Sequence, residues 1–225
     1  AWTKEGVLGQ EKTDALTFWG WSEDGSKYAF EVVYSGAGGA SCEGRFQLFV
    51  VDAQTDKFDA DGVLTVEHDE HEPENGQCTP ADLSAVMDEK RPGHLEAHNI
   101  TVGNVVTPSS YTAQERNRWS VETPTGTAIT VAFSVVGGGR DHVMESGKGA
   151  AYRLRYIDSF GKWNSIESGK HHRQIVWDYD VSSAPVFFSP NGTHVAFFLQ
   201  RSELDFEGNR ITWMSNGAPL PSDLF

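Results

Sequence analysis

The sequence predicts a mostly β protein, built from antiparallel, repeated strand pairs in a propeller-like or sandwich arrangement. Two observations lead to this fold class. A polar turn that ends in Gly recurs at residues 21–25, 123–126 and 188–192, and each copy runs into a strand that contains Ala-Phe. Apolar residues also alternate with polar ones along several segments. We expect one β-rich domain over 1–225, with a single short helix in a probable insertion at 66–118.

The first repeated unit begins with the turn Ser22-Glu23-Asp24-Gly25 and enters a strand through Ala29-Phe30. Gly and Asp favour such a turn, because they adopt positive φ at little steric cost. After a Gly-rich loop comes the segment 46–51, which is nearly continuous in apolar residues. This pattern is typical of a strand that is covered on both faces.

The second unit places Gly137-Gly138-Gly139 in the loop between its two strands. Its second strand, 152–157, alternates strictly and puts Tyr152, Leu154 and Tyr156 on one face. Arg153 and Arg155 then point the other way, as in a half-buried strand. The third unit repeats the order with strands at 196–199 and 211–214.

The single helix is expected after residue 79. Thr79 suits the cap, Pro80 the first helical position and Asp82 the place of a capping-box partner. The helix is predicted to end near Arg91-Pro92-Gly93 and to bury three apolar side chains, namely Leu83, Val86 and Met87.

The charge of the chain excludes two classes of partner. Lys and Arg number 18 against 32 Asp and Glu, for a formal net charge of −14. Phosphate backbones of nucleic acids and anionic membrane surfaces are repelled by such a chain. No segment approaches the roughly 20 apolar residues that a membrane span needs, so neither nucleic acid nor a membrane span is expected.

The two cysteines and the first residues indicate an oxidising compartment. The chain begins Ala1-Trp2, without Met, as expected for a secreted or periplasmic product after removal of a signal peptide. Cys42 and Cys78 occupy loops that can approach each other. A disulfide between them would stabilise the fold by roughly 4 kcal/mol on the chain-entropy model. The alternative is two unrelated free thiols.

These motifs bear a family resemblance. The Ser-x-Asp-Gly turn that leads to Ala-Phe, the strand closing on Val51-Asp52, a mid-chain helix and the late Glu207-Gly208 pair resemble a family of predicted secreted bacterial proteins of unknown function. The turns at 22–25 and 189–192 are also similar to the turn signatures of β-propeller repeats. The resemblance implies export and a β-rich fold, and it supplies no catalytic residues.

Histidines offer one candidate site. His68 and His71 lie among carboxylates, and His94 and His98 have the i, i+4 spacing that places two side chains on one helix face. Imidazole with carboxylate suits Zn²⁺ or Cu²⁺, provided that three or four ligands converge. The alternative is that the first pair lies in a solvated acidic loop and the second has an ordinary surface or capping role.

Aromatic residues offer another candidate. Alternation predicts that Trp19 and Trp21 share one face of their strand, and that Trp177 faces away from Asp178 and Asp180. Exposed Trp beside carboxylates can form a platform for sugars, and the two aspartates could contribute to a Ca²⁺ site. The alternative is that the Trp residues belong to the hydrophobic core.

No enzyme is predicted, because the chain contains no nucleophile elbow, no phosphate-binding loop and no His-Glu-x-x-His motif. The leading hypothesis is an exported, acidic binding protein that takes a protein, glycan or small ligand on the variable loops between its strands. Metal binding through the His/Glu-rich insertion is the alternative. An extracytoplasmic hydrolase with a carboxylate pair is a more distant one.

Overall fold

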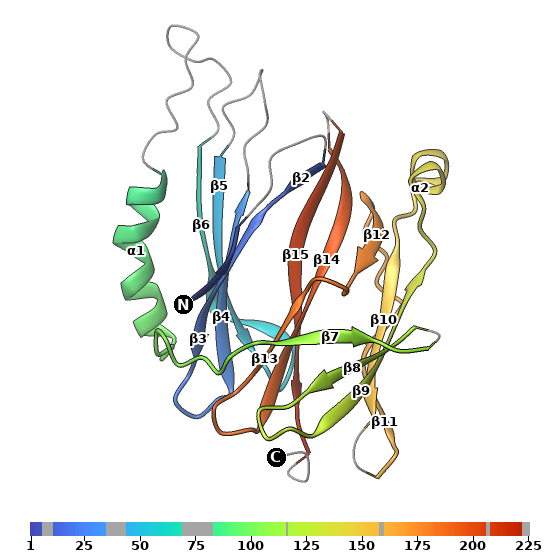
Figure 1. Ribbon diagram of the computed structural model, residues 1–225. Coiled ribbons are helices and arrows are strands. Elements are labelled where there is room, and N and C mark those ends of the chain that lie inside the picture. Colours follow the sequence, from blue (N-terminus) through green and yellow to red (C-terminus); the bar gives the residue numbers. More distant parts are fainter. Residues whose placement is uncertain are drawn as a thin grey trace, which may run out of the picture.

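The chain folds into two curled, mainly antiparallel sheets that together form a half-barrel (Figure 1). The computed structural model describes residues 1–5, 11–34, 44–68, 83–115, 117–157, 160–205 and 208–221. The prediction of a mostly β fold is confirmed. The propeller-like or sandwich arrangement of repeats stays a prediction.

The first sheet has five strands, in the order β1 (Trp2–Lys4), β3 (Ala15–Trp21), β4 (Lys27–Tyr34), β5 (Gly44–Asp52) and β6 (Lys57–His68). The second sheet has ten strands. Its order is β11 (Trp163–Ser168), β10 (Ala151–Ile157), β9 (Ala128–Val136), β8 (Arg118–Glu122), β7 (Ser109–Ala113), β13 (Pro185–Phe188), β14 (His194–Asp205), β15 (Gly208–Pro219) and β2 (Glu11–Thr13), with β12 (Val176–Asp180) paired to β14.

Three turns share one hydrogen-bond pattern. In each, the hydroxyl oxygen of the first residue accepts from a backbone N–H at or just before the start of the next strand, and the Gly N–H donates to the carbonyl of the first residue. The first residues are Ser22, Thr123 and Ser189, and the glycines are Gly25, Gly126 and Gly192. The side chain thus satisfies backbone groups locally, which explains how a short polar motif directs strand entry.

The first and third of these turns also contact each other. Asn191 Nδ2 donates to the carbonyl oxygen of Asp24 over 2.6 Å, which ties the five-stranded sheet to the ten-stranded one. Gly25 has a φ of +70°, and a Cβ there would lie 2.5 Å from Asn191 Oδ1. Glycine therefore serves both the turn and the contact between sheets.

The core lies between and within the curled sheets. Strand β14 is buried on both faces: Phe198 packs edge-on against Phe18 of the first sheet, while Phe197 stacks near Tyr156 of β10. Tyr152 of β10 donates to Asn216 Oδ1 of β15 over 2.6 Å. The ten-stranded sheet therefore curls far enough for two strands that are not neighbours in its order to meet.

Helix α1 (Leu83–Ala97) covers the outer face of the first sheet (Figure 1). Its buried side chains Met87 and Leu95 pack with Leu48 and Val50 of β5 in a second, smaller core. Arg91 anchors the helix: its Nε donates to Glu31 Oε2 of β4 over 2.8 Å, and its guanidinium lies 4.4 Å from the ring centre of Trp19.

Two helix predictions are corrected by the structure. Helix α1 does not end near Arg91-Pro92-Gly93 but continues through Pro92 to Ala97, since burial of Leu95 beyond the proline offsets the hydrogen bond that proline removes. Val86 is 38% exposed rather than buried, because the spacing of four that aligns Met87, Arg91 and Leu95 turns Val86 outward. The expected capping residues 79–82 lie outside the described residues.

A second helix, α2 (Arg140–Ser146), occupies the loop after Gly139, where sequence analysis expected no helix. It ends at Gly147, which has the left-handed conformation typical of a helix C-terminus. Within the described part of the chain, neither helix has the length and apolar character needed to span a membrane.

Candidate ligand-binding cleft

A cleft of about 880 Å³ opens between the inner face of the first sheet and the concave side of the second. Strands β4, β5 and β6 and the turn between β5 and β6 supply one wall. Strands β11, β14 and β15 and the loop after β11 supply the other. This volume falls in the range of small-molecule sites, which favour the mouths of barrel-like sheets.

The wall from the first sheet is aromatic. Phe30 stacks on Phe49 with ring centres 4.9 Å apart, and Phe49 stacks on Phe58 at 5.4 Å. Phe58 remains 59% exposed, an unusual position for so large an apolar side chain. Trp213 and Met214 of β15 line the opposite wall. A flat apolar molecule would therefore find ring faces in this cleft.

Asp56 joins the two walls at one end of the cleft. It lies in the turn between β5 and β6 with a φ of +54°, a left-handed conformation that few residues other than Gly, Asn and Asp adopt. Its Oδ2 accepts from Asn216 Nδ2 and its Oδ1 from the backbone N–H of Gly217, both over 2.6 Å. A Cβ at Gly217 would lie 2.7 Å from Ala53 Cα, so glycine is what lets the turn dock on β15.

A polar chain continues inward from Asp56. Asn216 accepts from the hydroxyl of Tyr152, and the ring of Tyr152 lies 4.7 Å from that of Tyr179. Arg173 donates to the hydroxyl of Tyr179 over 3.3 Å, and its guanidinium lies 5.7 Å from the ring centre of Tyr152. Residues from a turn, three strands and a loop thus hold one another in fixed positions.

The carboxyl of Asp56 has an altered affinity for protons. Burial raises its pKa to about 6, although the donors on Asn216 and Gly217 act in the opposite direction. A buried acid with a pKa this close to neutrality, lining a cleft, is typical of functional sites.

The second acid of the cleft is Glu167. Burial alone would raise its pKa, but hydrogen bonds from His171 and from the backbone N–H groups of Gly169 and Ser168 lower it. Its Oε2 lies 3.0 Å from Nδ1 of His171, whose side chain is exposed at the edge of the cleft. Glu167 is thus held as a carboxylate by groups of the protein itself.

Cations exceed acids along the lining. Lys57, Arg173 and Arg201 accompany only Asp56 and Glu167, and both acids are engaged by protein donors. Arg201 is paired with Glu203 at 2.6 Å. Lys57 has no ion pair among the residues that the structure describes. The cleft consequently offers a positive charge rather than a negative one to a ligand.

Trp19 and Trp21, predicted to share a face, lie on opposite faces of the first sheet. The pairing of β3 with β4 shifts between Phe18 and Gly20, so Trp19 is the extra residue of a bulge. Trp19 consequently packs against the α1 side, while Trp21 is fully buried in the main core. The bulge inverts the period-2 alternation on which the prediction depended.

The segment around Trp177 contains a second bulge. The register of β12 with β14 shifts between Val176 and Asp178, so Trp177 again is the extra residue. Asp178 accepts from the N–H of Tyr179, and Asp180 accepts from Ser182. The two aspartates make local hydrogen bonds, and none of these five predicted ligand-binding residues lines the cleft.

Of the four predicted metal ligands, the structure brings two together. The rings of His94 and His98 lie 4.7 Å apart, as their spacing on a helix predicts, and His98 Nδ1 lies 2.7 Å from Asp59 Oδ2. Burial and the neighbouring His98 lower the pKa of His94.

His68 lies far from this pair. It pairs with Gly44, beside Leu83 at the start of α1, whereas His94 and His98 are near its end, about 20 Å along the helix axis. His71 lies outside the described residues. Among described side chains, no three His, Cys, Asp or Glu residues form a group that could hold a metal ion. Cys42 and Cys78 also lie outside the described residues, so the disulfide stays a prediction.

Sequence reasoning missed the residues that build the cleft. Asp56 appears only as an ordinary turn residue, and its partner Asn216 lies 160 positions later. The exposed Phe58 carries no signal of its own in a strand-forming segment. The one available hint was the presence of three phenylalanines, Phe46, Phe49 and Phe58, within a short stretch of the sequence.

Comparison of the chain with protein-family models, with curated proteins and with solved structures finds no match. Function is therefore inferred from the geometry of the chain itself.

Proposed function

We propose that the protein binds a small organic molecule in the cleft between its two sheets. The observation that supports this is the cavity of about 880 Å³ with a stacked aromatic wall, which includes a Phe58 ring left 59% exposed. What singles out this ring is its place on the lining of the cleft, at the end of the aromatic stack. This function is a specific form of the expected binding protein, with the site in a cleft between sheets rather than on inter-strand loops.

The chemistry of the lining indicates what such a ligand resembles. Ring faces on one wall and Met214 on the other favour a flat apolar body. Because Asp56 and Glu167 are engaged by protein donors and Lys57 has no described ion pair, the polar end of the ligand is an acceptor such as a carboxylate or sulfonate. Export to a secreted or periplasmic location remains part of the proposal.

The dye 1-anilinonaphthalene-8-sulfonate has these features and serves as the probe. We expect saturable binding to the folded protein at one site, with a rise in dye fluorescence. Phe58→Ser removes the outermost ring and is expected to weaken binding about ten-fold, the effect of losing roughly 1.4 kcal/mol of contact. Lys57→Gln should weaken binding of the sulfonate and leave binding of an uncharged naphthalene analogue unchanged.

A matched control is available on the same strand. Val63 of β6 is also exposed, at 39%, and does not line the cleft, so Val63→Ser removes apolar surface without touching the site. Equal loss of dye binding in Val63→Ser and Phe58→Ser would contradict the proposal, as would dye fluorescence that follows the unfolded fraction. A melting curve of each variant checks that the protein remains folded.

Metal binding through the histidines also stays a prediction, because His71 lies outside the described residues. Elemental analysis of protein purified without chelator tests for Zn, Cu or Ca directly. Metal that persists after joint replacement of His68, His71, His94 and His98 would rule out this site.

A further inference from the structure

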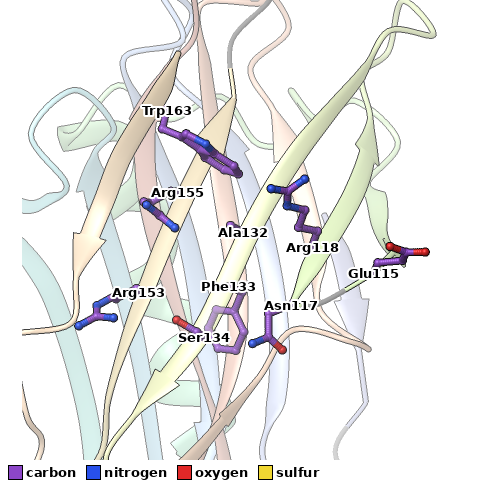
Figure 2. Close-up of a pocket in the computed structure, with 9 residues that line it drawn as sticks. All are labelled: Glu115, Asn117, Arg118, Ala132, Phe133, Ser134, Arg153, Arg155 and Trp163. Atoms are coloured by element: carbon purple, nitrogen blue, oxygen red, sulfur yellow. The ribbon is translucent and has the colours of Figure 1, made fainter. Parts of the chain in front are cut away.

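A second concave site lies on the outward face of the ten-stranded sheet, away from the cleft. It has a volume of about 470 Å³ and is lined by residues of strands β8 to β11 together with Glu115 and Asn117, which precede β8 (Figure 2). Glu115, the one acid of this lining, has no ion pair among the described residues. Tyr152 and Leu154 of β10 face the core, so Arg153 and Arg155 between and after them face outward. This arrangement is the one that strict alternation along 152–157 predicts.

Strand register brings arginines together at this site. Ala132 of β9 pairs with Arg118 of β8 on one side and with Arg155 of β10 on the other. The two arginines thus flank a single small residue, with Cα atoms about 10 Å apart across two strand spacings. Arg153, two residues along β10, pairs with Ser134. Small side chains between the arginines leave the floor of the site open.

Trp163 of β11 lies among the arginines. Its ring centre is 5.0 Å from the guanidinium of Arg155 and 5.8 Å from that of Arg118 (Figure 2). The stem of Arg153 packs over Gly169, where a Cβ would lie 2.7 Å from Arg153 Cγ. Trp163 and Gly169 restrict the conformations of the arginine side chains. Binding of a ligand therefore costs less conformational entropy than it would with freely moving arginines.

Charge balance is what marks this site as unusual. The chain carries a net charge of −14, yet none of the ion pairs among the described residues involves Arg118, Arg153 or Arg155. Of the six other described arginines, those at positions 45, 91, 201 and 210 contact a carboxylate, whereas Arg140 and Arg173 do not. Neighbouring arginines repel one another, and an acidic protein has many carboxylates that could pair with them. Arg118 and Arg155, both beside the Trp163 ring and both without a carboxylate partner in the described part of the chain, therefore leave a place for an external anion.

We infer that this pocket binds a phosphate or sulfate group, as the charged part of a small molecule. Guanidinium forks match tetrahedral oxyanions by paired hydrogen bonds, and Arg118 and Arg155 supply two such forks beside one ring. The ring of Trp163 lies where it can contact the organic part that carries the group. This site is separate from the cleft, and neither depends on the other.

Calorimetric titration with inorganic pyrophosphate at constant ionic strength tests the inference. We expect saturable binding at one site, at least ten-fold weaker in Arg155→Gln and in Arg118→Gln. Arg45→Gln is the matched control, since Arg45 is an exposed arginine that pairs with Glu67 and lies over the ring of Tyr34 on the other sheet. Equal weakening in this control, or no saturable binding by the wild type, would overturn the inference.

Two further measurements separate a binding role from a structural one. Pyrophosphate should change tryptophan fluorescence in the wild type and fail to do so in Trp163→Phe. Without anion, Arg155→Gln should melt at about the same temperature as the wild type, because the relief of repulsion between nearby arginines offsets the lost contact with Trp163. A lower melting temperature together with unchanged pyrophosphate affinity would show that Arg155 only supports Trp163.

Parallel titrations identify the source of the anion. Stronger binding of pyrophosphate than of sulfate supports a phosphorylated ligand, and the reverse order supports a sulfated one. Citrate carries comparable charge on carboxylates, so citrate binding as tight as either would overturn the assignment to a tetrahedral oxyanion.

Discussion

Two arginine–tryptophan contacts in this molecule differ in one respect. Arg91 lies 4.4 Å from the ring centre of Trp19 and also binds the buried carboxylate of Glu31. Arg155 lies 5.0 Å from the ring centre of Trp163 and has no ion pair with a carboxylate among the described residues. The same pair of side chains fixes a helix in the first case and leaves donors open in the second. The carboxylate, rather than the aromatic ring, separates a structural arginine from one available to a ligand.

The largest effect is expected from breaking the structural pair. Arg91→Met leaves Glu31, 3% exposed, without its partner, and should lower the free energy of unfolding by about 3–5 kcal/mol. Urea denaturation measures this loss. The double variant Glu31→Leu/Arg91→Met should be more stable than Arg91→Met alone, because no unpaired charge remains buried. Glu31→Leu alone completes the cycle. If the double variant lost the sum of the effects of Glu31→Leu and Arg91→Met, Arg91 would act through packing instead.

Asp56 is a buried acid that differs from Glu31 in its partners. It accepts hydrogen bonds from Asn216 and Gly217 and from no arginine that the structure describes. Its pKa of about 6 lies above that of an unfolded Asp, near 4, so the native state binds more protons than the unfolded state between these values. Its contribution to stability is thus complete below pH 4 and is lost as the pH rises through 6. The loss is at most about 3 kcal/mol, from two pKa units at about 1.4 kcal/mol each.

Unfolding free energies of the wild type and of Asp56→Asn, measured from pH 4 to 7, isolate this contribution. Glu31 also has a pKa raised by burial, so the wild type alone does not separate the two acids. Asp56→Asn cannot ionise at position 56 and should show a shallower fall over this range. Parallel curves for the two proteins would assign the pH dependence to other groups.

The smallest effect is expected from supplying the missing carboxylate. Arg155→Glu would face Arg118 across Ala132 and lie beside Arg153, and should raise stability by about 0.3–1 kcal/mol as an exposed ion pair. The gain should diminish in 1 M NaCl. Pyrophosphate binding should disappear in the same variant. Destabilisation that salt does not alter would mean that Arg155 contributes to the fold by contacts other than charge.

Local patterns predicted the parts of the fold that local chemistry decides. The alternation along 152–157 placed three residues inward and Arg153 and Arg155 outward, as the structure shows. Where the pattern failed, the cause lay in a neighbouring strand: single extra residues at Trp19 and Trp177 create bulges that alternation does not reveal. Helix α1 passes Pro92 because contacts with the sheet outweigh the local cost of proline.

The sequence by itself determined the strand-forming segments, the three capped turns and the acidic balance of the chain, since each depends on residues within a few positions of one another. Only the tertiary structure decided where Asp56 meets Asn216, and that Arg118 and Arg155 flank Ala132. These contacts depend on strand order and register across the sheets. Both are set by packing between distant segments, and both candidate sites are made of such contacts.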